Sequence, residues 1–463
     1  MKTITPSLKV VLSLSLAVGL LVIFSSVLPA RSAVPHLGYG FNVAAWDTQR
    51  LQNMGFNWIK VFEAPQSPLP QFVLLRVDVN AQTTQTALLD DLDAKLAYKN
   101  NIQAWEIGNE VNIDAPYGWN ATPDVAAYKS LLCTAYNKIK SQSPNAIVVS
   151  AGLAPVGRLS DTRQIDERVF LQQLLATGGG ACLDVVGFHP YGYSADYNAV
   201  PDIASSDPIQ NCDQGFCFRG AEKIYEVMQA NGAGDKKMWA TEFGWITQPP
   251  RECLADSSWK GRAWQIVSPD KQASNLAGAF QYADAHWPWM GAMFVFNLDF
   301  NQDPLRQPCD QMRFFSVKGQ PAESALANMP KNLVTTLTGK LKTAPPAVGG
   351  LVGVSEQPLT PALSIDLSNW GWQPVAYTAT ADTGAALVPV IANPTGTLSA
   401  TADIPLRMTL PGFSRTLGIY TGTVIVNWSA PGVNPAVRTV PVQVNVVGQV
   451  YRTYLPLLAN NTP

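Results

Sequence analysis

Short apolar runs alternate with amphipathic stretches along most of this 463-residue chain. Continuous apolar runs are typical of strands buried on both faces, whereas apolar residues spaced three and four apart are typical of helices. The runs predict strands at residues 36–43, 56–62, 72–79, 102–110, 146–151, 183–188, 238–242 and 292–297. The amphipathic stretches predict helices at residues 48–54, 85–98, 123–143, 167–176, 219–231, 271–286 and 322–329.

Eight predicted strands separated by helices match one architecture. They indicate an α/β fold of the (β/α)8 TIM-barrel type, which we assign to residues 34–342. The connection at residues 63–71 holds three prolines and is too short for a full helix, so we expect an irregular crossover there. The helix near residue 123 has the clearest start, with Thr122 as its expected cap and Pro123 at the first position.

The composition changes after the predicted barrel. Paired prolines and glycines predict a linker over residues 343–360. Short alternating apolar and polar runs follow, which predicts a small all-β, immunoglobulin-like sandwich over residues 361–449, and residues 450–463 form a tail with no assigned role. Four aromatic residues of this region suit either the sandwich core or an exposed glycan-binding face: Trp370, Trp372, Tyr377 and Trp428.

Residues 1–33 have the pattern of an export signal. Lys2 and Lys9 precede a nearly continuous apolar run over residues 10–28, and small residues follow it. This pattern is typical of a secretory signal peptide cleaved after Ser32 or Ala33, although the same run would also serve as an uncleaved anchor. We therefore expect a protein that is secreted or held at the cell surface, and whose mature chain does not span a membrane.

The charge and residue content narrow the expected partners. Charged residues make up 14% of the chain and the net charge is −2, which argues against nucleic acid or an anionic membrane surface. The 13 tryptophans suit a neutral ligand such as a polysaccharide, although most tryptophans are expected in the core. With only three histidines and no Cys-x-x-Cys pair, no zinc site is expected, and we expect a monomer without a cofactor.

Export makes disulfides reasonable for the six cysteines, which allow 15 pairings. The predicted elements favour one set of three. Two cysteines share a loop, two follow the seventh and eighth strands at the same barrel rim, and two flank the region between the fourth and sixth strands. The expected pairs are Cys212–Cys217, Cys253–Cys309 and Cys133–Cys182.

The fourth and seventh predicted strands both end in a glutamate, Glu110 and Glu242. The C-terminal ends of barrel strands meet at one face, where functional groups gather. Cleavage of a glycosidic bond needs two carboxylates, one to protonate the leaving oxygen and one to attack the sugar carbon or activate water. These two glutamates are therefore the candidate catalytic pair.

Three motifs stand at the ends of the fourth, sixth and seventh predicted strands: Gly108-Asn109-Glu110, Gly187-Phe188-His189-Pro190-Tyr191 and Trp239-Ala240-Thr241-Glu242-Phe243-Gly244-Trp245. Together they resemble the retaining glycoside hydrolases of clan A, the "4/7" superfamily, and most closely its families 39 and 5. The resemblance spans about residues 36–330. In the C-terminal region, residues 417–426 and 440–444 resemble bacterial BACON-type immunoglobulin-like modules.

The resemblance implies a role for each matching residue. Glu110 would be the general acid/base and Glu242 the nucleophile, in a retaining pair about 5–5.5 Å apart. Asn109 would hydrogen-bond the sugar 2-hydroxyl, Tyr191 would donate to Glu242, and His189 would line the sugar subsite. Repulsion from Glu242 and burial would raise the pKa of Glu110 and keep it protonated.

The sequence departs from the family pattern around the sugar subsite. Lys60 ends the second strand where many relatives carry arginine, and Phe296 ends the eighth where many carry tryptophan. Lys60 is nevertheless expected to be one of the residues that bind the substrate. Trp245, Trp46 and Phe296 are candidates to stack on the sugar or to pack in the core. Glu106 is expected to be structural, paired inside the barrel with Arg76 of the neighbouring strand.

The sequence thus favours a secreted retaining glycoside hydrolase that cleaves a poly- or oligosaccharide by double displacement. A transglycosylase that remodels a glycan would use the same residues. A non-catalytic carbohydrate-binding protein on a degenerate barrel is a third hypothesis, which the presence of both glutamates disfavours.

Overall fold

The computed structural model describes residues 36–256, 259, 261–333, 340–345, 347–354, 363–369, 371, 374–398, 402–410, 416–430 and 433–448. The predicted signal segment, the tail, Trp370 and Trp372 lie outside the described residues.

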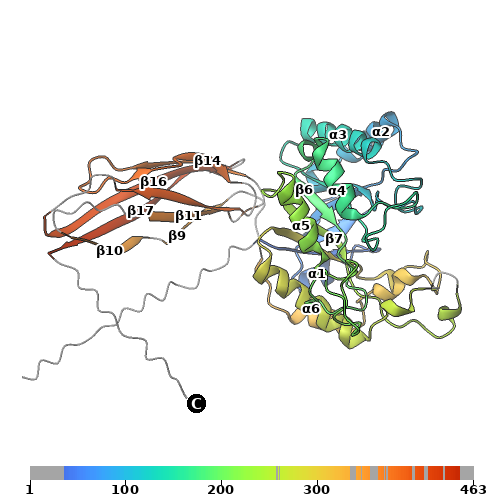
Figure 1. The fold of residues 1–463 in the computed structure, drawn as a ribbon. Helices are drawn as coiled ribbons and strands as arrows, with labels where there is room; N and C mark the ends of the chain where they lie inside the picture. The colour runs from blue at the N-terminus through green and yellow to red at the C-terminus, as the bar shows by residue number, and fades with distance from the viewer. Residues whose placement is uncertain are drawn as a thin grey trace, which may run out of the picture. The chain divides into compact units, whose positions relative to one another are not determined.

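Eight parallel strands close into a barrel, and each strand pairs with the next one along the chain. These strands belong to the part of the chain coloured from blue to yellow in Figure 1. The pairing of the last strand with the first, through Gly40 opposite Phe294, completes the ring. This confirms the predicted TIM barrel. The strands are β1 (Gly38–Asn42), β2 (Trp58–Val61), β3 (Phe72–Val77), β4 (Ala104–Asn109), β5 (Ile147–Gly152), β6 (Val185–Phe188), β7 (Lys237–Phe243) and β8 (Met290–Val295).

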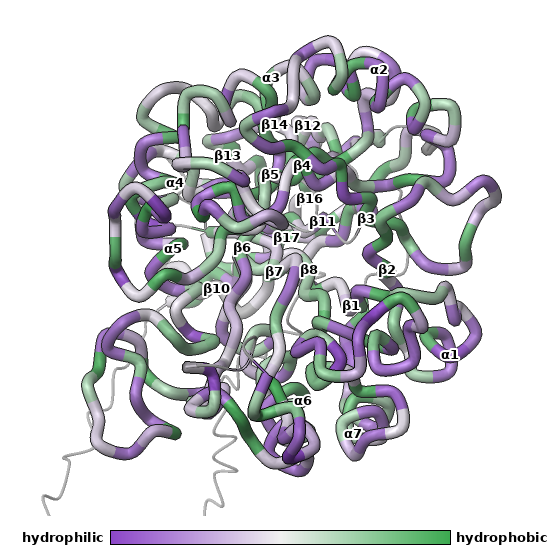
Figure 2. The backbone as a smooth tube through the Cα atoms, turned by 90° about the vertical axis from the view of Figure 1, so that its right-hand side faces the viewer, coloured by the Kyte–Doolittle hydropathy of each residue, from purple (hydrophilic) through white to green (hydrophobic). Residues whose placement is uncertain are grey.

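Helices surround the ring of strands, as Figure 2 shows. The clearest predicted helix begins later than expected, because Asp124, and not Thr122, has the extended backbone of a cap and accepts from the N–H groups of Ala126 and Ala127. Residues 63–71 contain no helix, as predicted. The helices are α1 (Thr48–Asn53), α2 (Gln85–Leu96), α3 (Val125–Gln142), α4 (Glu167–Ala176), α5 (Gly220–Ala230), α6 (Pro269–His286) and α7 (Pro321–Asn328).

Large aromatic side chains fill the inside of the barrel opposite small residues. The rings of Trp58 and Trp239 lie 5.0 Å apart, and Phe294 lies 6.0 Å from each of them. A Cβ atom at Gly40 would stand 2.4 Å from the Phe294 ring, so β1 must offer glycine there. This packing closes one part of the barrel interior and leaves polar side chains to the opposite end.

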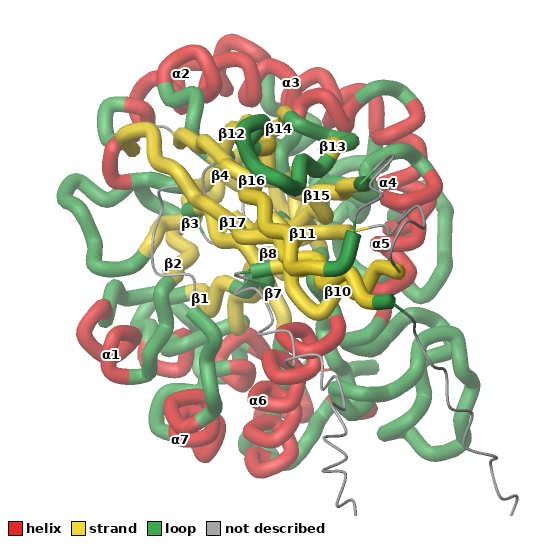
Figure 3. Tube along the Cα trace, turned by 90° about the vertical axis from the view of Figure 1, so that its left-hand side faces the viewer, coloured by secondary structure: helices red, strands yellow, loops and turns green. Residues whose placement is uncertain are grey.

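The C-terminal region folds into two sheets that share a separate hydrophobic core (Figure 3). The first has the order β10-β17-β16-β12-β14 and the second β13-β15-β11-β9. This confirms an all-β domain after the barrel. The strands are β9 (Leu341–Ala344), β10 (Val348–Val354), β11 (Leu363–Asn369), β12 (Val375–Ala381), β13 (Val390–Ile391), β14 (Thr395–Leu398), β15 (Asp403–Thr409), β16 (Gly418–Ala430) and β17 (Val433–Val447).

In this domain the structure corrects one expectation and decides between two alternatives for another. The range 343–360, predicted as a linker, contains the end of β9 and all of β10, which pair with β11 and β17. The glycines of β10 and the prolines between β9 and β10 gave this range the composition of a linker, because both residues are unusual in strand interiors. Tyr377 and Trp428 are buried in the core, so they do not form an exposed glycan-binding face.

All three predicted disulfides are present. Cys133 of α3 is bonded to Cys182 just before β6, and Cys212–Cys217 closes a loop after β6. Cys253–Cys309 joins the loops that follow β7 and β8. Of the helices in the described part of the chain, none has both the length and the apolar character that a membrane span requires.

The separate cores predict that the barrel folds without the C-terminal domain. A protein ending after Leu333, which packs on the barrel core, should unfold in one cooperative transition, because its core contains no residue of the C-terminal sheets. Circular dichroism melting tests this. A truncated protein that exposes its core, detected by dye binding, would contradict the independence of the two cores.

Candidate active site

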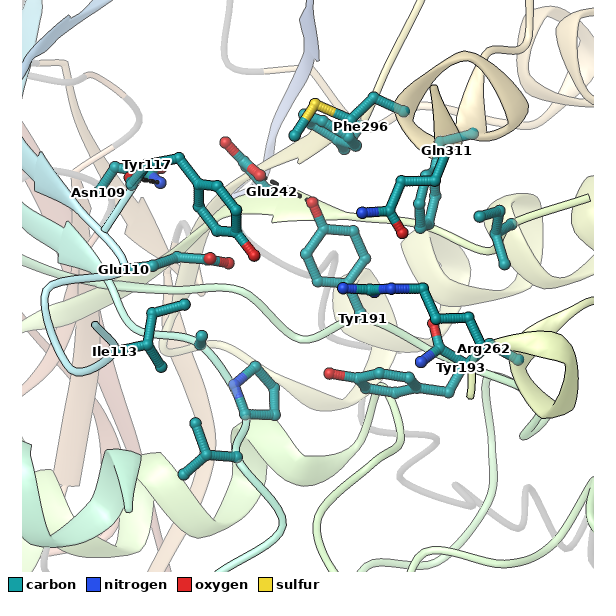
Figure 4. Close-up of a pocket in the computed structure, with 18 of the residues that line it drawn as sticks. Asn109, Glu110, Ile113, Tyr117, Tyr191, Tyr193, Glu242, Arg262, Phe296 and Gln311 are labelled. Carbon is teal, nitrogen blue, oxygen red and sulfur yellow. Dashed lines mark hydrogen bonds between the residues drawn. The ribbon is translucent and has the colours of Figure 1, made fainter. Parts of the chain in front are cut away.

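Glu110 and Glu242 lie at the C-terminal end of the barrel and line one pocket of about 800 Å³. Figure 4 shows their carboxylates pointing into the same space. Glu110 directly follows β4 and has a φ of 42°, in the left-handed region that few residues other than glycine adopt. Such strained positions cluster at functional sites, where surrounding contacts hold them. The structure therefore brings the two predicted glutamates together.

A buried lysine links the nucleophile candidate to a second glutamate. The ammonium of Lys60 lies 2.7 Å from Glu106 Oε2 and 3.1 Å from Glu242 Oε1, and the lysine is fully buried. Lys60 therefore holds carboxylates and does not face the pocket as a sugar-binding residue. The predicted pairing of Glu106 with Arg76 is wrong, because Arg76 instead lies 2.8 Å from Asp78.

The surroundings of Glu242 favour its ionised form. The Tyr191 hydroxyl donates to Glu242 Oε2 at 2.7 Å, which is the contact that the family resemblance implied. Burial opposes ionisation and would raise the pKa of this carboxyl. The charge of Lys60, helped by other nearby cations and by the tyrosine hydroxyl, outweighs burial and lowers the pKa of Glu242 to about 2. Glu242 is thus a carboxylate throughout the neutral range.

His189 lies behind the pocket, between the two glutamates. Its Nδ1 is 3.0 Å from Glu110 Oε1 and 3.8 Å from Glu242 Oε2, and its Nε2 is 3.1 Å from Thr241 Oγ1. The ring is fully buried, so it positions carboxylates and does not line the sugar subsite as predicted. Since both oxygens neighbour one nitrogen, they are at most about 7 Å apart, below most of the ~6.5–9.5 Å range of inverting pairs.

Gly152, the last residue of β5, makes room for this histidine. A Cβ atom at residue 152 would stand 2.1 Å from His189 Nε2. Its backbone N–H donates to Glu106 Oε1 at 3.3 Å, and its carbonyl accepts from the backbone N–H of Glu110 at 2.9 Å. The backbone of this glycine therefore contacts both Glu106 and Glu110.

Asn109 precedes Glu110 and also lines the pocket. Its Nδ2 donates to the backbone carbonyl of Tyr117 at 2.9 Å, which fixes the side-chain amide. Its buried Oδ1 accepts no hydrogen bond from the described residues. Leaving a buried acceptor without a hydrogen bond costs free energy, so this oxygen is suited to accept a hydrogen bond from a hydroxyl group of a ligand.

The three predicted stacking residues have different surroundings. Phe296 lines the pocket. Trp245 is fully buried and its indole N–H donates to the Ala195 carbonyl at 2.7 Å, so it is a core residue. Trp46 is 38% exposed but is not among the pocket-lining residues. Of the three, only Phe296 is placed to touch a ligand in this pocket.

Several pocket residues were not predicted from the sequence. They come from loops after β4, β6, β7 and β8, where no periodic pattern marks them. Figure 4 shows the tyrosine rings and the guanidinium directed toward the two glutamates. A cluster of aromatic and polar residues in loops that follow strands was the only available signal. They are Tyr117, Tyr193, Phe216, Arg262, Trp264 and Gln311.

Comparison with known proteins gives distant similarities in fold. No protein-family model and no curated protein sequence matches the chain. Among solved structures, a GH128 subgroup II endo-β-1,3-glucanase from Sorangium cellulosum is 15% identical, covering 64% of this chain and 100% of its own, with a TM-score of 0.44. A β-glucuronidase from Bacteroides uniformis is 14% identical, and the match covers 87% of this chain and 43% of the glucuronidase, with a TM-score of 0.40.

A GH128 subgroup I endo-β-1,3-glucanase from Amycolatopsis mediterranei, in complex with laminaripentaose, is 14% identical. It covers 63% of this chain and 99% of its own, with a TM-score of 0.40. All three similar structures are glycoside hydrolases, but at these scores the likeness carries no argument about activity. The resemblance to families 39 and 5 and to BACON modules stays a prediction. Within the described residues, no group of three or more acidic, histidine or cysteine side chains is arranged to hold a metal ion.

Lys60→Met should destabilise the protein by about 3–5 kcal/mol at pH 7, because it leaves two buried carboxylates without their cation. The lowered pKa of Glu242 stabilises the fold above the ordinary carboxyl pKa, and this stabilisation is lost as the pH falls through about 2. The difference in the free energy of unfolding between the variant and the wild type should therefore shrink as the pH falls toward 2. Urea unfolding at a series of pH values measures it.

The double variant Lys60→Met/Glu106→Gln is the matched control. Removing one of the two unpaired carboxylate charges should restore on the order of 1 kcal/mol or more of the lost free energy of unfolding. A single variant as stable as wild type at pH 7 would show that the buried lysine does not hold the two carboxylates.

Proposed function

We propose that this protein is a secreted retaining glycoside hydrolase. The observation that carries the proposal is the unequal environment of two glutamates facing one pocket. Glu242 is held ionised by Lys60 and Tyr191, whereas His189 is the one side chain among the described residues that hydrogen-bonds Glu110 at the pocket. Glycosidases that use two carboxylates need this difference, because one must attack while the other donates a proton. The three disulfides support export.

In the first step, the Glu242 carboxylate attacks the anomeric carbon of the sugar. Glu110 gives its proton to the glycosidic oxygen, and the leaving half of the chain departs as an alcohol. The sugar is now esterified to Glu242. The Tyr191 hydroxyl, whose pKa burial and the Glu242 charge raise well above its usual value, stays protonated and holds Glu242 Oε2 in line.

In the second step, Glu110 acts as the base. It takes a proton from water, and the resulting hydroxide attacks the anomeric carbon and releases Glu242. Two displacements at one carbon give net retention of configuration. His189, bonded to Glu110 Oε1, fixes the position of this carboxyl in both steps. The unpaired Oδ1 of Asn109 is suited to accept a hydrogen bond from the sugar hydroxyl next to the anomeric carbon.

Glu242→Ala should lower turnover on the order of 10³-fold or more, because in the described part of the chain Glu110, the proton donor, is the only other carboxylate that lines the pocket. External azide should restore part of the activity and give a glycosyl azide of inverted configuration. The wild type should release its first product with retained configuration, measured by NMR. Screening begins with polysaccharides and nitrophenyl glycosides, including β-1,3-glucans and glucuronides.

Glu226→Ala is the matched control for this loss, since Glu226 lies exposed on α5 and should keep full activity. An inverted first product would contradict the retaining assignment. Near-normal turnover of Glu242→Ala would place the chemistry elsewhere. Transfer of the sugar to an added oligosaccharide, in preference to water, would identify the protein as a transglycosylase.

Glu110→Ala should harm substrates with poor leaving groups most, because they depend on its proton. The loss should be about 10²–10⁴-fold for unactivated glycosides and much smaller for dinitrophenyl glycosides. Comparing kcat/KM across aryl glycosides of different leaving-group pKa measures this. An equal loss for all leaving groups would assign Glu110 a structural role.

A further inference from the structure

An exposed tryptophan lies at the edge of the candidate active site. Trp264 is 48% exposed and lines the same pocket as Glu110 and Glu242. It follows β7 in a short helical turn, Ala263–Gln265. Large aromatic side chains are usually buried, and one left open at a pocket is a candidate for binding a ligand.

Two further rings hold Trp264 in a defined orientation. Tyr193 stacks on it at 5.5 Å with an interplanar angle of 9°, so one face of the indole is covered. Phe216 contacts both rings, at 5.7 Å from Trp264 and 4.8 Å from Tyr193. The three rings form what we call the aromatic platform: Tyr193, Phe216 and Trp264.

The loops around the platform are constrained. Phe216 lies inside the ring closed by Cys212–Cys217, and Cys253–Cys309 ties the loop before Trp264 to the loop after β8. Tyr193 has a φ of 52°, a strained backbone position that the surrounding contacts must maintain. A surface tryptophan without a role would not need this support.

The platform lies toward Glu110. Tyr193 and Glu110 line the same pocket, and burial and then the charge of Glu110 raise the pKa of Tyr193 above its usual value. Figure 4 shows the Tyr193 ring on the same side of the pocket as Arg262. In the proposed reaction Glu110 protonates the oxygen of the departing chain. The departing sugar units therefore occupy this side.

Resting on the proposed function, we propose that Trp264 stacks against a sugar ring of the leaving half of a poly- or oligosaccharide, so that this side of the pocket binds a sugar chain and not only a small leaving group. A pyranose ring has apolar C–H groups on its faces, and an aromatic face buries them with little loss of side-chain freedom. The pocket of about 800 Å³ reaches from the two glutamates to this indole.

Trp264→Ala tests the proposal on two kinds of substrate. One is the set of oligosaccharides of two to six units from the polysaccharide cleaved fastest in the screen, and the other is the shortest nitrophenyl glycoside that is cleaved. For the longer oligosaccharides KM should rise on the order of tenfold, the effect of losing one stacked aromatic contact. For the nitrophenyl glycoside, kcat and KM should stay within about twofold, because its leaving group does not reach the indole.

Two variants control for non-specific effects. Trp264→Phe keeps an aromatic face and should keep most of the affinity for long oligosaccharides. Trp46→Ala removes another exposed tryptophan that does not line the pocket, and should change kcat and KM for neither substrate.

Three results would overturn the proposal. An equal loss of kcat/KM on both substrates would assign Trp264 a structural role. Unchanged kcat/KM on both would show that the exposed indole face binds another partner, such as a protein. A loss that grows with units added to the non-reducing end of nitrophenyl glycosides would place the indole on the other half of the chain. Failure of the proposed function is a different outcome, because the wild type would then cleave no substrate.

Discussion

One buried cation organises the polar end of this barrel. Lys60 of β2 contacts Glu106 of β4 and Glu242 of β7, so three strands that are not all neighbours are linked through a single ammonium. Burying a charged lysine destabilises a fold unless carboxylates compensate its charge. Burying carboxylates in the same place likewise destabilises the fold without the lysine. The three groups are stable only together. Their arrangement fixes the charge of Glu242 before any ligand binds.

The pairing also explains why the two pocket glutamates differ. Glu242 shares its charge with Lys60 and accepts from Tyr191, while Glu110 stands on a strained backbone at the pocket with His189 beside it. The difference arises from which inward-facing positions of the barrel carry cations. The fold brings the two glutamates close together because it places the strand ends on one rim. Their neighbouring side chains then determine which glutamate is held ionised.

Much of the architecture followed from the sequence because strong local patterns agreed with the fold. Buried parallel strands appear as continuous apolar runs. The strand ends located both glutamates, and the order of strands, helices and loops placed the cysteines of all three disulfides. Contacts across the barrel were harder to foresee. Alternation along a strand shows that Lys60 points inward, but not which of the other inward residues it meets, so Glu106 was paired with Arg76. Strand ends do not show which side chains reach the pocket either, so Trp245 and His189 were both expected closer to the sugar than they lie.

Loops contributed what the pattern did not reveal. Tyr193, Arg262 and Trp264 lie in long connections without periodicity, where neither burial nor direction can be inferred from spacing. The same limit applied to β9 and β10, because the glycines of β10 and the prolines between the two strands matched a linker better than strands.

The absence of a side chain at Gly152 has a consequence for how this site tolerates change. Any L-residue with a Cβ atom at that position would push into His189, and through it into the surroundings of both pocket carboxylates. The position has no functional group and would escape a search for catalytic side chains. It nevertheless offers a diagnostic: a related barrel with the same glutamates but a larger residue at the end of its fifth strand must support its proton donor in another way.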